Sequence, residues 1–497
     1  MNSPETFRPA KPHSATRHLF RSVPWVVLEA GFNVVHGLSS VFAIGLLVPP
    51  GELGKASVAL STVLFIESFT SMGLQEAVIR SRSGDTITTD TAFCLALCFA
   101  LAGVLLATIA AFPLGYLYDD YQITSLLLSS SSLLPLNALT LVPAAKLARK
   151  LRGGTLTKRM ILGKFAGLAT LFLFGLLGAG AWAVVVSAIA TSAGGLFVLT
   201  LFATRFPRLR FDRPKARELL GFGVIQSLEN VFWSATYRIF GILLGYLHGS
   251  VALGYFYFAQ RLVEEMASML QLLVNRFALS FFAGLERAAS SGATIGAFIA
   301  GTRVLTSVAA PAFALLAFFA EDVLIIFFGH RWDPAGPLIA ILSIGWIFAF
   351  PRVLVGPMLR ARGDQMLVLY YAGLSCAFTL LACIASARYP LFVVALAWTT
   401  RHLIAIPWSA WVVHYRLGIA YKTLAELTIR PLLAVFAMSV VILAVGYIVP
   451  SLERHLQLAI QVTIGLIVYA CTIYFVDRES LNLMRRIAYS VLGRARL

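Results

Sequence analysis

Charged side chains are scarce in this sequence. Only 13% of its 497 residues are Asp, Glu, Lys or Arg, whereas 59% are hydrophobic. In soluble globular domains about a quarter of all residues are charged. The apolar residues also stand in runs of about 20 or more, the length that a helix needs to cross a bilayer. The composition therefore excludes a soluble globular domain and predicts a polytopic membrane protein.

Cysteine is also rare, and its five positions all lie within apolar runs: Cys94, Cys98, Cys376, Cys383 and Cys471. They do not indicate a disulfide framework. No cluster of His or acidic residues accompanies them, so we predict no metal site and no cofactor. Basic residues outnumber acidic ones, 40 against 23. In a membrane chain this excess marks cytoplasmic loops, so nucleic acid is not a predicted partner.

Glycine, proline and charged clusters divide the apolar runs into about fourteen predicted transmembrane helices. They cover residues 24–48, 52–79, 88–113, 120–145, 157–177, 180–204, 218–247, 252–282, 293–320, 335–359, 365–387, 390–413, 429–449 and 456–476. With a cytoplasmic N-terminus, the inner segments hold 29 of the 40 Lys and Arg residues and the outer segments hold 4. This split satisfies the positive-inside rule and predicts two cytoplasmic termini.

A weak internal repeat relates positions 200 residues apart. The turns "GLLVPPGELG" (45–54) and "GYLHGSVALG" (245–254) match, and residues 28–68 share ten identities with the residues 200 further on, including Glu29 with Glu229. Six predicted helices lie between the copies, so both copies have the same orientation. A parallel repeat of this kind is typical of a transporter with its site between the two halves.

The predicted fold is therefore an all-α polytopic membrane protein with two parallel-repeat six-helix lobes and two C-terminal helices. Its segments are a cytoplasmic N-terminal tail (1–23), an N-lobe (24–204), a basic cytoplasmic linker (205–217), a C-lobe (218–415), helices 13 and 14 (416–476) and a basic cytoplasmic tail (477–497).

Several polar residues interrupt the predicted helices. A polar group at bilayer depth is costly, so it usually faces an internal cavity and has a function. Arginine offers phosphate a fixed fork of donors. The candidates for substrate binding in a cavity between the lobes are Arg238, Arg303, Arg401, Arg261, Asn33, Glu229 and Asn230. The candidates for binding a coupling ion are Glu29, Glu67 and Glu265.

Architectural roles are alternatives for some of these charges. Arg261 precedes Glu264 and Glu265 by three and four residues, the spacing of a salt bridge within one helix. Lys164 and Arg352 lie near predicted cytoplasmic helix ends, where a long side chain reaches the lipid head groups.

Three segments match sequence motifs of a known family and occur in the same order as in that family. They are "LLVPPGELGKASVALSTVLFIESFTSMGLQEAVIRS" (46–81), "RIFGILLGYLHGSVALGYFYFAQRL" (238–262) and "FFGHRWDPAGPLIAIL" (327–342). The sequence resembles the Wzx-like polysaccharide transporter (oligosaccharide flippase) family of the MOP exporter superfamily. Two positions differ from that family. Leu53 replaces the usual aromatic residue, and Tyr237 stands where many relatives have Asp.

The resemblance implies a flippase of the bacterial inner membrane that moves an undecaprenyl-pyrophosphate-linked oligosaccharide for exopolysaccharide, capsule or O-antigen synthesis. It implies a fold shared with multidrug extruders and peptidoglycan-precursor flippases. The expected partners are the lipid-linked oligosaccharide, membrane lipids and polysaccharide polymerase or export proteins. We expect a monomer, and coupling to H⁺ or Na⁺ is left open.

Two other functions serve as alternatives. A cation-coupled exporter of drugs or of another lipid-linked precursor has the same architecture, but a drug exporter normally has twelve spans. A membrane glycan polymerase or ligase needs a large outer loop with catalytic side chains. The longest outer segment here, 321–334, is short and apolar. No loop has a Gly-rich phosphate motif or paired carboxylates, so we predict a transporter rather than an enzyme.

Overall fold

The computed structural model describes residues 12–70, 73–80, 86–149, 153–202, 206–221, 224–287, 291–448 and 453–477. All the secondary structure in these ranges is helical, which confirms the predicted all-α fold. Residues 1–11 of the predicted N-terminal tail and residues 478–497 of the predicted C-terminal tail lie outside the described residues.

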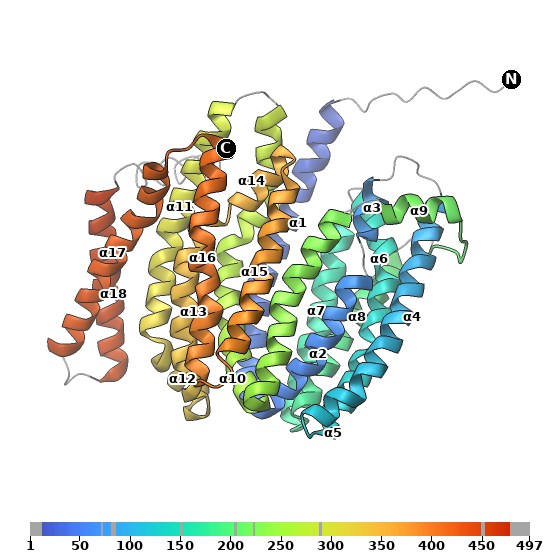
Figure 1. The fold of residues 1–497 in the computed structure, drawn as a ribbon, viewed down its shortest axis with the longest axis horizontal. Coiled ribbons are helices and arrows are strands. Elements are labelled where there is room, and N and C mark those ends of the chain that lie inside the picture. Colours follow the sequence, from blue (N-terminus) through green and yellow to red (C-terminus); the bar gives the residue numbers. More distant parts are fainter. Residues whose placement is uncertain are drawn as a thin grey trace. The chain divides into compact units, whose positions relative to one another are not determined.

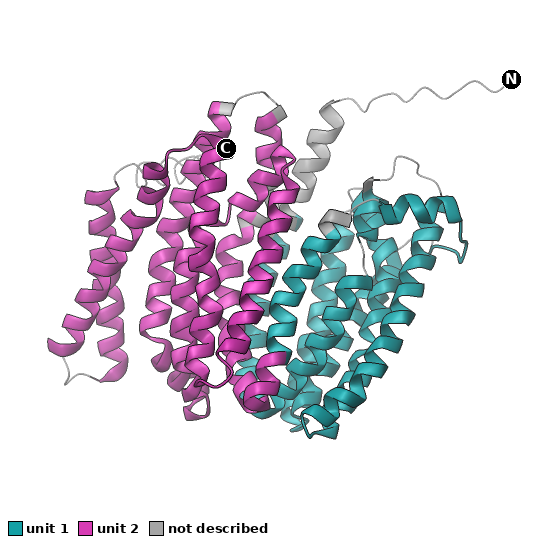
Figure 2. Ribbon diagram, viewed as in Figure 1, with its two compact units in different colours: residues 1–242 teal, residues 243–497 magenta. Residues whose placement is uncertain are grey.

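Contacts divide the chain into two compact units, residues 1–242 and 243–497 (Figure 2). The division falls inside a long helix, beyond the 205–217 linker at which the sequence analysis places the lobe boundary.

The first unit is a bundle of helices that the sequence orders as successive hairpins (Figure 1). Its elements are α1 (Pro12–Leu47), α2 (Pro50–Thr70), α3 (Leu74–Arg80), α4 (Thr86–Leu117), α5 (Tyr121–Ser130), α6 (Leu133–Arg149), α7 (Gly153–Leu176), α8 (Ala181–Phe202), α9 (Arg213–Gly221) and the start of α10 (Val224–Arg287). Within it α1 packs on α7, α7 on α8, and α4 on α6.

The second unit contains the rest of α10 and the remaining helices. These are α11 (Ser291–Phe318), α12 (Ala320–Phe328), the 3₁₀ turn η1 (His330–Ala335), α13 (Gly336–Ala349), the 3₁₀ turn η2 (Phe350–Arg352), α14 (Val355–Arg362), α15 (Gln365–Ala385), α16 (Leu391–Leu417), α17 (Tyr421–Ile448) and α18 (Arg454–Val476). Helix α13 packs between α11 and α16, and α17 packs on α11 and α18.

Thirteen helices among the described residues have the length and apolar character of membrane spans. One of them, Ser227–Leu272, has 46 residues, more than twice the length that a bilayer needs. Gly249 interrupts it with a φ of 85°, a conformation that glycine adopts without a steric penalty. The sequence predicts two helices here. The count of fourteen follows if the two parts of α10 cross separately, and it stays a prediction.

The matching turn of the first repeat uses proline instead of glycine. Helix α1 ends at Leu47 and α2 begins at Pro50, the first helical position, where the missing N–H of proline costs nothing. Glu52 then accepts hydrogen bonds from Gln122 Nε2 (3.1 Å) and from the backbone N–H of Ala181 (3.0 Å). The Glu of the quoted motif therefore joins the N-terminal ends of α2, α5 and α8.

Small residues bring α7 and α8 into close contact. Gly163 and Gly167 form a G-x-x-x-G pattern on α7 and face Ser187, Thr191 and Gly195 of α8. A Cβ atom at position 163 would lie 2.8 Å from the backbone oxygen of Thr191. Glycine at such spacing lets membrane helices approach until their backbones touch.

The basic linker is attached to the first unit from Phe206 onward. The backbone N–H of Arg208 donates to Asp90 Oδ1 at 3.0 Å, and that of Asp212 donates to Thr91 Oγ1 at 3.1 Å. Both acceptors lie near the start of α4.

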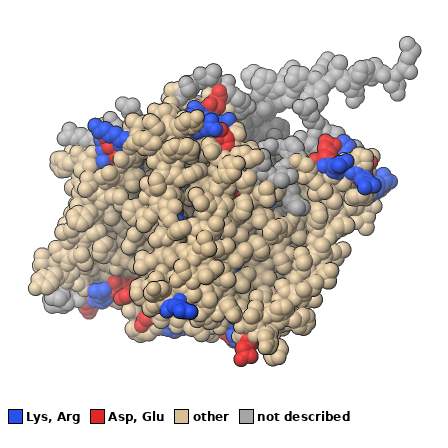
Figure 3. Space-filling model, viewed as in Figure 1, with Lys and Arg blue, Asp and Glu red and all other residues tan. Residues whose placement is uncertain are grey.

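On the face shown in Figure 3, charged side chains gather at the helix ends and leave the surface between them largely uncharged, as a membrane-spanning protein requires.

Candidate substrate and coupling site

Two predicted site residues on α1 are bonded to α7. Lys164 Nζ donates to Asn33 Oδ1 at 2.7 Å, and the Thr157 hydroxyl donates to Glu29 Oε2 at 3.2 Å. The sequence suggested that Lys164 reaches toward the lipid head groups, but its side chain is bonded to Asn33 instead. It supplies a positive charge to the polar stripe of α1, which Glu29, Asn33 and His36 form at helical spacing.

Glu67, Asn137 and Arg238 form a second polar cluster in the first unit. Asn137 Nδ2 on α6 donates to Glu67 Oε1 on α2 at 2.8 Å. The guanidinium of Arg238 on α10 interacts electrostatically with the Glu67 carboxylate. Among the described residues Arg238 makes no closer ion pair and no hydrogen bond. A coupling candidate and a substrate candidate are therefore electrostatically linked.

The other two candidates of the first unit lie on α10 about two turns before Arg238. Glu229 is buried, with 2% of its surface exposed, whereas the neighbouring Asn230 is exposed. They point to different sides of the helix because successive residues are 100° apart. The two side chains therefore do not form one subsite within this unit.

In the second unit, Arg401 lies in an aromatic and basic environment on α16. It is 5% exposed, and its guanidinium lies 3.6 Å from the centre of the Trp398 ring. Its Nε also donates to His402 Nε2 at 3.4 Å. The cation–π contact is one of the few ways to stabilise an arginine away from water. Its predicted contact with substrate stays a prediction.

Arg303 contacts the end of α18. Its Nε lies 3.7 Å from Oδ2 of Asp477, a carboxylate that is 2% exposed and that also pairs with Arg430 on α17 at 3.5 Å. The Tyr469 hydroxyl, on α18, donates to the backbone oxygen of Ser307 on α11 at 2.8 Å. These bonds attach α17 and α18 to α11. They give Arg303 an architectural role, while its predicted contact with substrate stays untested.

Arg261 and Glu265 both lie on the second part of α10 and are partly buried. Glu264, the alternative partner of Arg261, accepts a hydrogen bond from Gln260 at 2.8 Å. Among the described residues, no group of three or more His, Cys, Asp or Glu side chains is placed to hold a metal ion.

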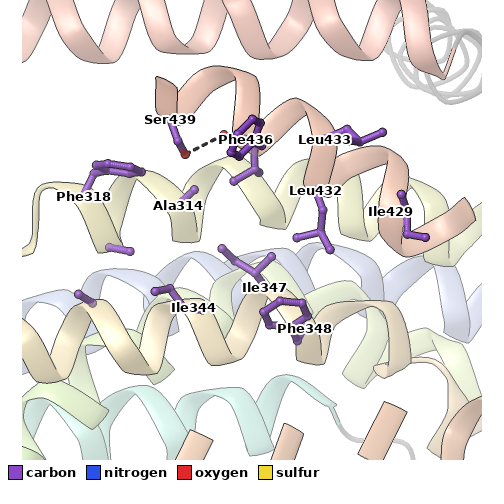
Figure 4. Close-up of a pocket in the computed structure, with 13 residues that line it drawn as sticks. Ala314, Phe318, Ile344, Ile347, Phe348, Ile429, Leu432, Leu433, Phe436 and Ser439 are labelled. Atoms are coloured by element: carbon purple, nitrogen blue, oxygen red, sulfur yellow. Dashed lines mark hydrogen bonds between the residues drawn. The ribbon is translucent and has the colours of Figure 1, made fainter. Parts of the chain in front are cut away.

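An apolar cavity of about 640 Å³ lies between α11, α13 and α17 of the second unit (Figure 4). Side chains from all three helices line it, among them Ala314, Phe318, Ile344, Ile347, Leu433 and Phe436. Its only polar side chain, Ser439, donates its hydroxyl to the backbone oxygen of Val435 at 2.8 Å. An elongated ligand in this cavity would therefore make dispersion contacts and almost no hydrogen bonds. These are the interactions that a hydrocarbon chain makes.

Sequence reasoning missed Asn137, the cavity and the true position of Lys164. Asn137 had a signal, because it is the one amide in the apolar run "SLLPLNALTL". The cavity had none, because its lining comes from three helices that are far apart in the sequence.

The sequence also matches known proteins. The profile of a family described as polysaccharide biosynthesis protein matches residues 46–337. The succinoglycan biosynthesis transport protein ExoT of Rhizobium meliloti (strain 1021) is 23% identical over 481 residues, which cover 94% of each chain. The teichuronic acid biosynthesis protein TuaB of Bacillus subtilis (strain 168) is 23% identical over 285 residues, 56% of this chain and 58% of that protein.

Solved structures share the fold. The lipid II flippase MurJ in an inward closed conformation aligns with a TM-score of 0.73 at 13% identity, covering 92% of this chain and 99% of MurJ. An inward-facing multidrug resistance MATE transporter of the MOP superfamily aligns with a TM-score of 0.51 at 17% identity, covering 80% and 95%. These neighbours are transporters, as predicted, and not enzymes. The chain belongs to the polysaccharide biosynthesis protein family, and it is a multi-pass membrane protein that shares the fold of MurJ.

Proposed function

We propose that this protein is a flippase of the bacterial inner membrane that carries an undecaprenyl-pyrophosphate-linked oligosaccharide from the cytoplasmic to the periplasmic leaflet by alternating access. The name of the relative ExoT, a transport protein of succinoglycan biosynthesis, supports a saccharide cargo. The MurJ-like fold supports a cargo that is linked to a lipid.

The apolar cavity is the observation that carries this proposal. A saccharide on a polyprenyl carrier brings a long hydrocarbon chain into the transporter, and a chain of this kind needs an apolar surface that extends along the helices. The cavity between α11, α13 and α17 provides one, with Phe436 and Leu433 on one side and Ile344 and Ile347 on the other (Figure 4). Helix α17 forms with α18 the C-terminal pair of helices that a drug exporter with twelve spans lacks.

The polar end of the cargo requires donors that the chain itself leaves available. Arg238 fits this role because its guanidinium has no direct partner among the described residues and is within electrostatic range of Glu67. A pyrophosphate that binds Arg238 would compete with Glu67 for the same positive charge. We propose that this competition links cargo binding to the ionisation of Glu67, through H⁺ or Na⁺.

A pair of tryptophan variants on α17 tests the role of the cavity. Leu433 lines the cavity and is 50% exposed, whereas Leu443 on the same helix is 63% exposed and does not line it. We expect Leu433→Trp to fill the cavity and to lower export of the polymer at least tenfold in a strain that lacks its own copy of the transporter. Leu443→Trp is the matched control and should leave export unchanged.

Equal export by wild type and Leu433→Trp at equal protein levels would contradict the role of the cavity. The rival function, export of a drug by cation exchange, predicts a different result. Cells would then gain resistance to cationic dyes, and polymer synthesis would not depend on the protein. We also propose that the protein is a monomer and that it associates with polysaccharide polymerase or export proteins.

A further inference from the structure

A second cavity of about 370 Å³ adjoins the apolar one and differs from it in chemistry. The two share Phe348 and Ile429 in their linings. The second cavity lies between α11, α13, η2, α14, α16 and α17. Its lining contains the guanidinium of Arg352 and several hydroxyls, among them that of Thr302, as well as apolar side chains. The apolar cavity and the cavity with polar donors therefore lie next to each other, an arrangement that suits a ligand with an apolar part and a polar part.

Arg352 is a partly buried cation whose donors are only partly used. Its Nε donates to the backbone oxygen of Phe348 at 3.3 Å and its Nη1 donates to the Tyr371 hydroxyl at 3.4 Å. Both distances are longer than the usual 2.7–2.9 Å of a charge-assisted bond, about half an ångström more. Among the described residues Arg352 makes no ion pair with a carboxylate. Removing one charge from water without a partner is costly, so the geometry favours an anion here.

The surroundings of Arg352 add to the positive charge. The guanidinium groups of Arg352 and Arg401 interact electrostatically and repel each other, and both interact with His402. A bound anion would relieve this repulsion. A long side chain near a predicted cytoplasmic helix end usually reaches toward the lipid head groups, but the side chain of Arg352 lines a cavity instead.

Thr302 provides a second, independent indication of a ligand. It is 2% exposed, and its hydroxyl has no hydrogen-bond partner among the described residues. The aliphatic hydroxyls of Ser409 and Thr428 in the same lining behave differently, because they donate to backbone oxygens of their own helices. A buried hydroxyl without a partner costs free energy, and an oxygen-rich ligand removes that cost.

We propose that the second cavity binds the phosphate of an anionic glycerophospholipid, one acyl chain of which lies in the apolar cavity. Arg352 and Thr302 donate to the phosphate oxygens. A volume of about 370 Å³ is near the lower end of ligand sites, so it admits a phosphate with glycerol but not a head group of several sugars. The inference rests on the proposed function in assigning the apolar cavity to a lipid chain, and it makes the phospholipid a competitor of the polyprenyl chain there.

Lipid retention by the purified full-length protein tests this site. The protein is delipidated in detergent and incubated with phosphatidylglycerol, with zwitterionic phosphatidylcholine or with a polyprenyl phosphate, and it is then analysed by native mass spectrometry. We expect wild type to retain one phosphatidylglycerol and to prefer it over phosphatidylcholine. Arg352→Gln should weaken this retention at least about tenfold, the effect of losing one charge-assisted hydrogen bond. Arg388→Gln removes the same charge from an exposed loop and should have no effect.

Thr302→Val keeps the shape of the side chain and guards against a variant that misfolds. It should weaken retention severalfold while the protein elutes as a single species in size exclusion. Equal retention of phosphatidylglycerol by wild type, Arg352→Gln and Thr302→Val would overturn the proposal. Arg352-dependent retention of a polyprenyl phosphate in place of phosphatidylglycerol would overturn the assigned occupant. Because the assay contains no cargo, its result is independent of whether the protein flips saccharides.

Discussion

Substitution of Gly163 by alanine tests how the packing of α7 on α8 supports the polar stripe of α1. The added Cβ would lie 2.8 Å from Thr191 O and 3.1 Å from the backbone nitrogen of Gly195. Both atoms belong to the backbone, so no side chain can rotate away and the two helices must separate. Overpacking of this kind costs about 1–3 kcal/mol. Alanine returns about 1 kcal/mol in helix propensity, so the net loss relative to wild type is about 0–2 kcal/mol, and the difference from a glycine-to-alanine variant without a clash is about 1–3 kcal/mol.

Gly31→Ala on α1 is the matched control, because nothing lies within 4 Å of a Cβ atom at that position. It keeps the gain in helix propensity without the clash. Thermal melting of the two purified variants in detergent should place Gly163→Ala several degrees below Gly31→Ala. Gly163→Ala should also lower polymer export, because Lys164 is the next residue and holds Asn33. Equal melting temperatures for the two variants would refute the close backbone contact.

Three further predictions concern single contacts. Arg238→Gln should abolish transport at normal protein levels and Arg238→Lys should restore part of it, since lysine keeps the charge but not the fork of donors; polymer output against protein abundance measures this. Tyr118→Phe removes a hydroxyl that donates to Ile242 O at 2.5 Å and should cost about 1 kcal/mol. Burial raises the pKa of Tyr118, so the hydroxyl stays protonated and the melting difference from wild type should be the same at pH 7 and pH 9. Asp322→Asn weakens the bidentate pair with Arg454, and because that arginine is 58% exposed, the melting temperature should fall less than in Gly163→Ala.

The helices were predictable because their signals are local. Apolar runs of bilayer length mark the spans, and proline or glycine marks the turns between them. Predicted span 365–387 is observed as Gln365–Ala385, and predicted span 456–476 as Arg454–Val476. Gly249 breaks α10 within the predicted turn, because a positive φ at that position requires glycine.

The partners of the charged residues were not predictable from the sequence. Lys164 and Asn33 are 131 positions apart, so their bond depends on α1 packing against α7. Asp477 and Arg303 meet only because α18 returns to α11. Helical periodicity places a side chain on a face, but the neighbour of that face follows from the packing of all the helices. The sequence therefore identified residues at unusual depth and left open what each one contacts.

Transport of a lipid-linked saccharide by the purified protein tests the central claim most directly. Proteoliposomes would contain the protein and a polyprenyl-pyrophosphate saccharide with a fluorescent sugar, and a membrane-impermeant reductant would quench the label in the outer leaflet. The account predicts that wild type exposes the label of both leaflets to the reductant, whereas Arg238→Gln exposes only the outer one. Quenching by wild type that equals that of protein-free liposomes, with cationic dye transported by the same vesicles, would contradict it.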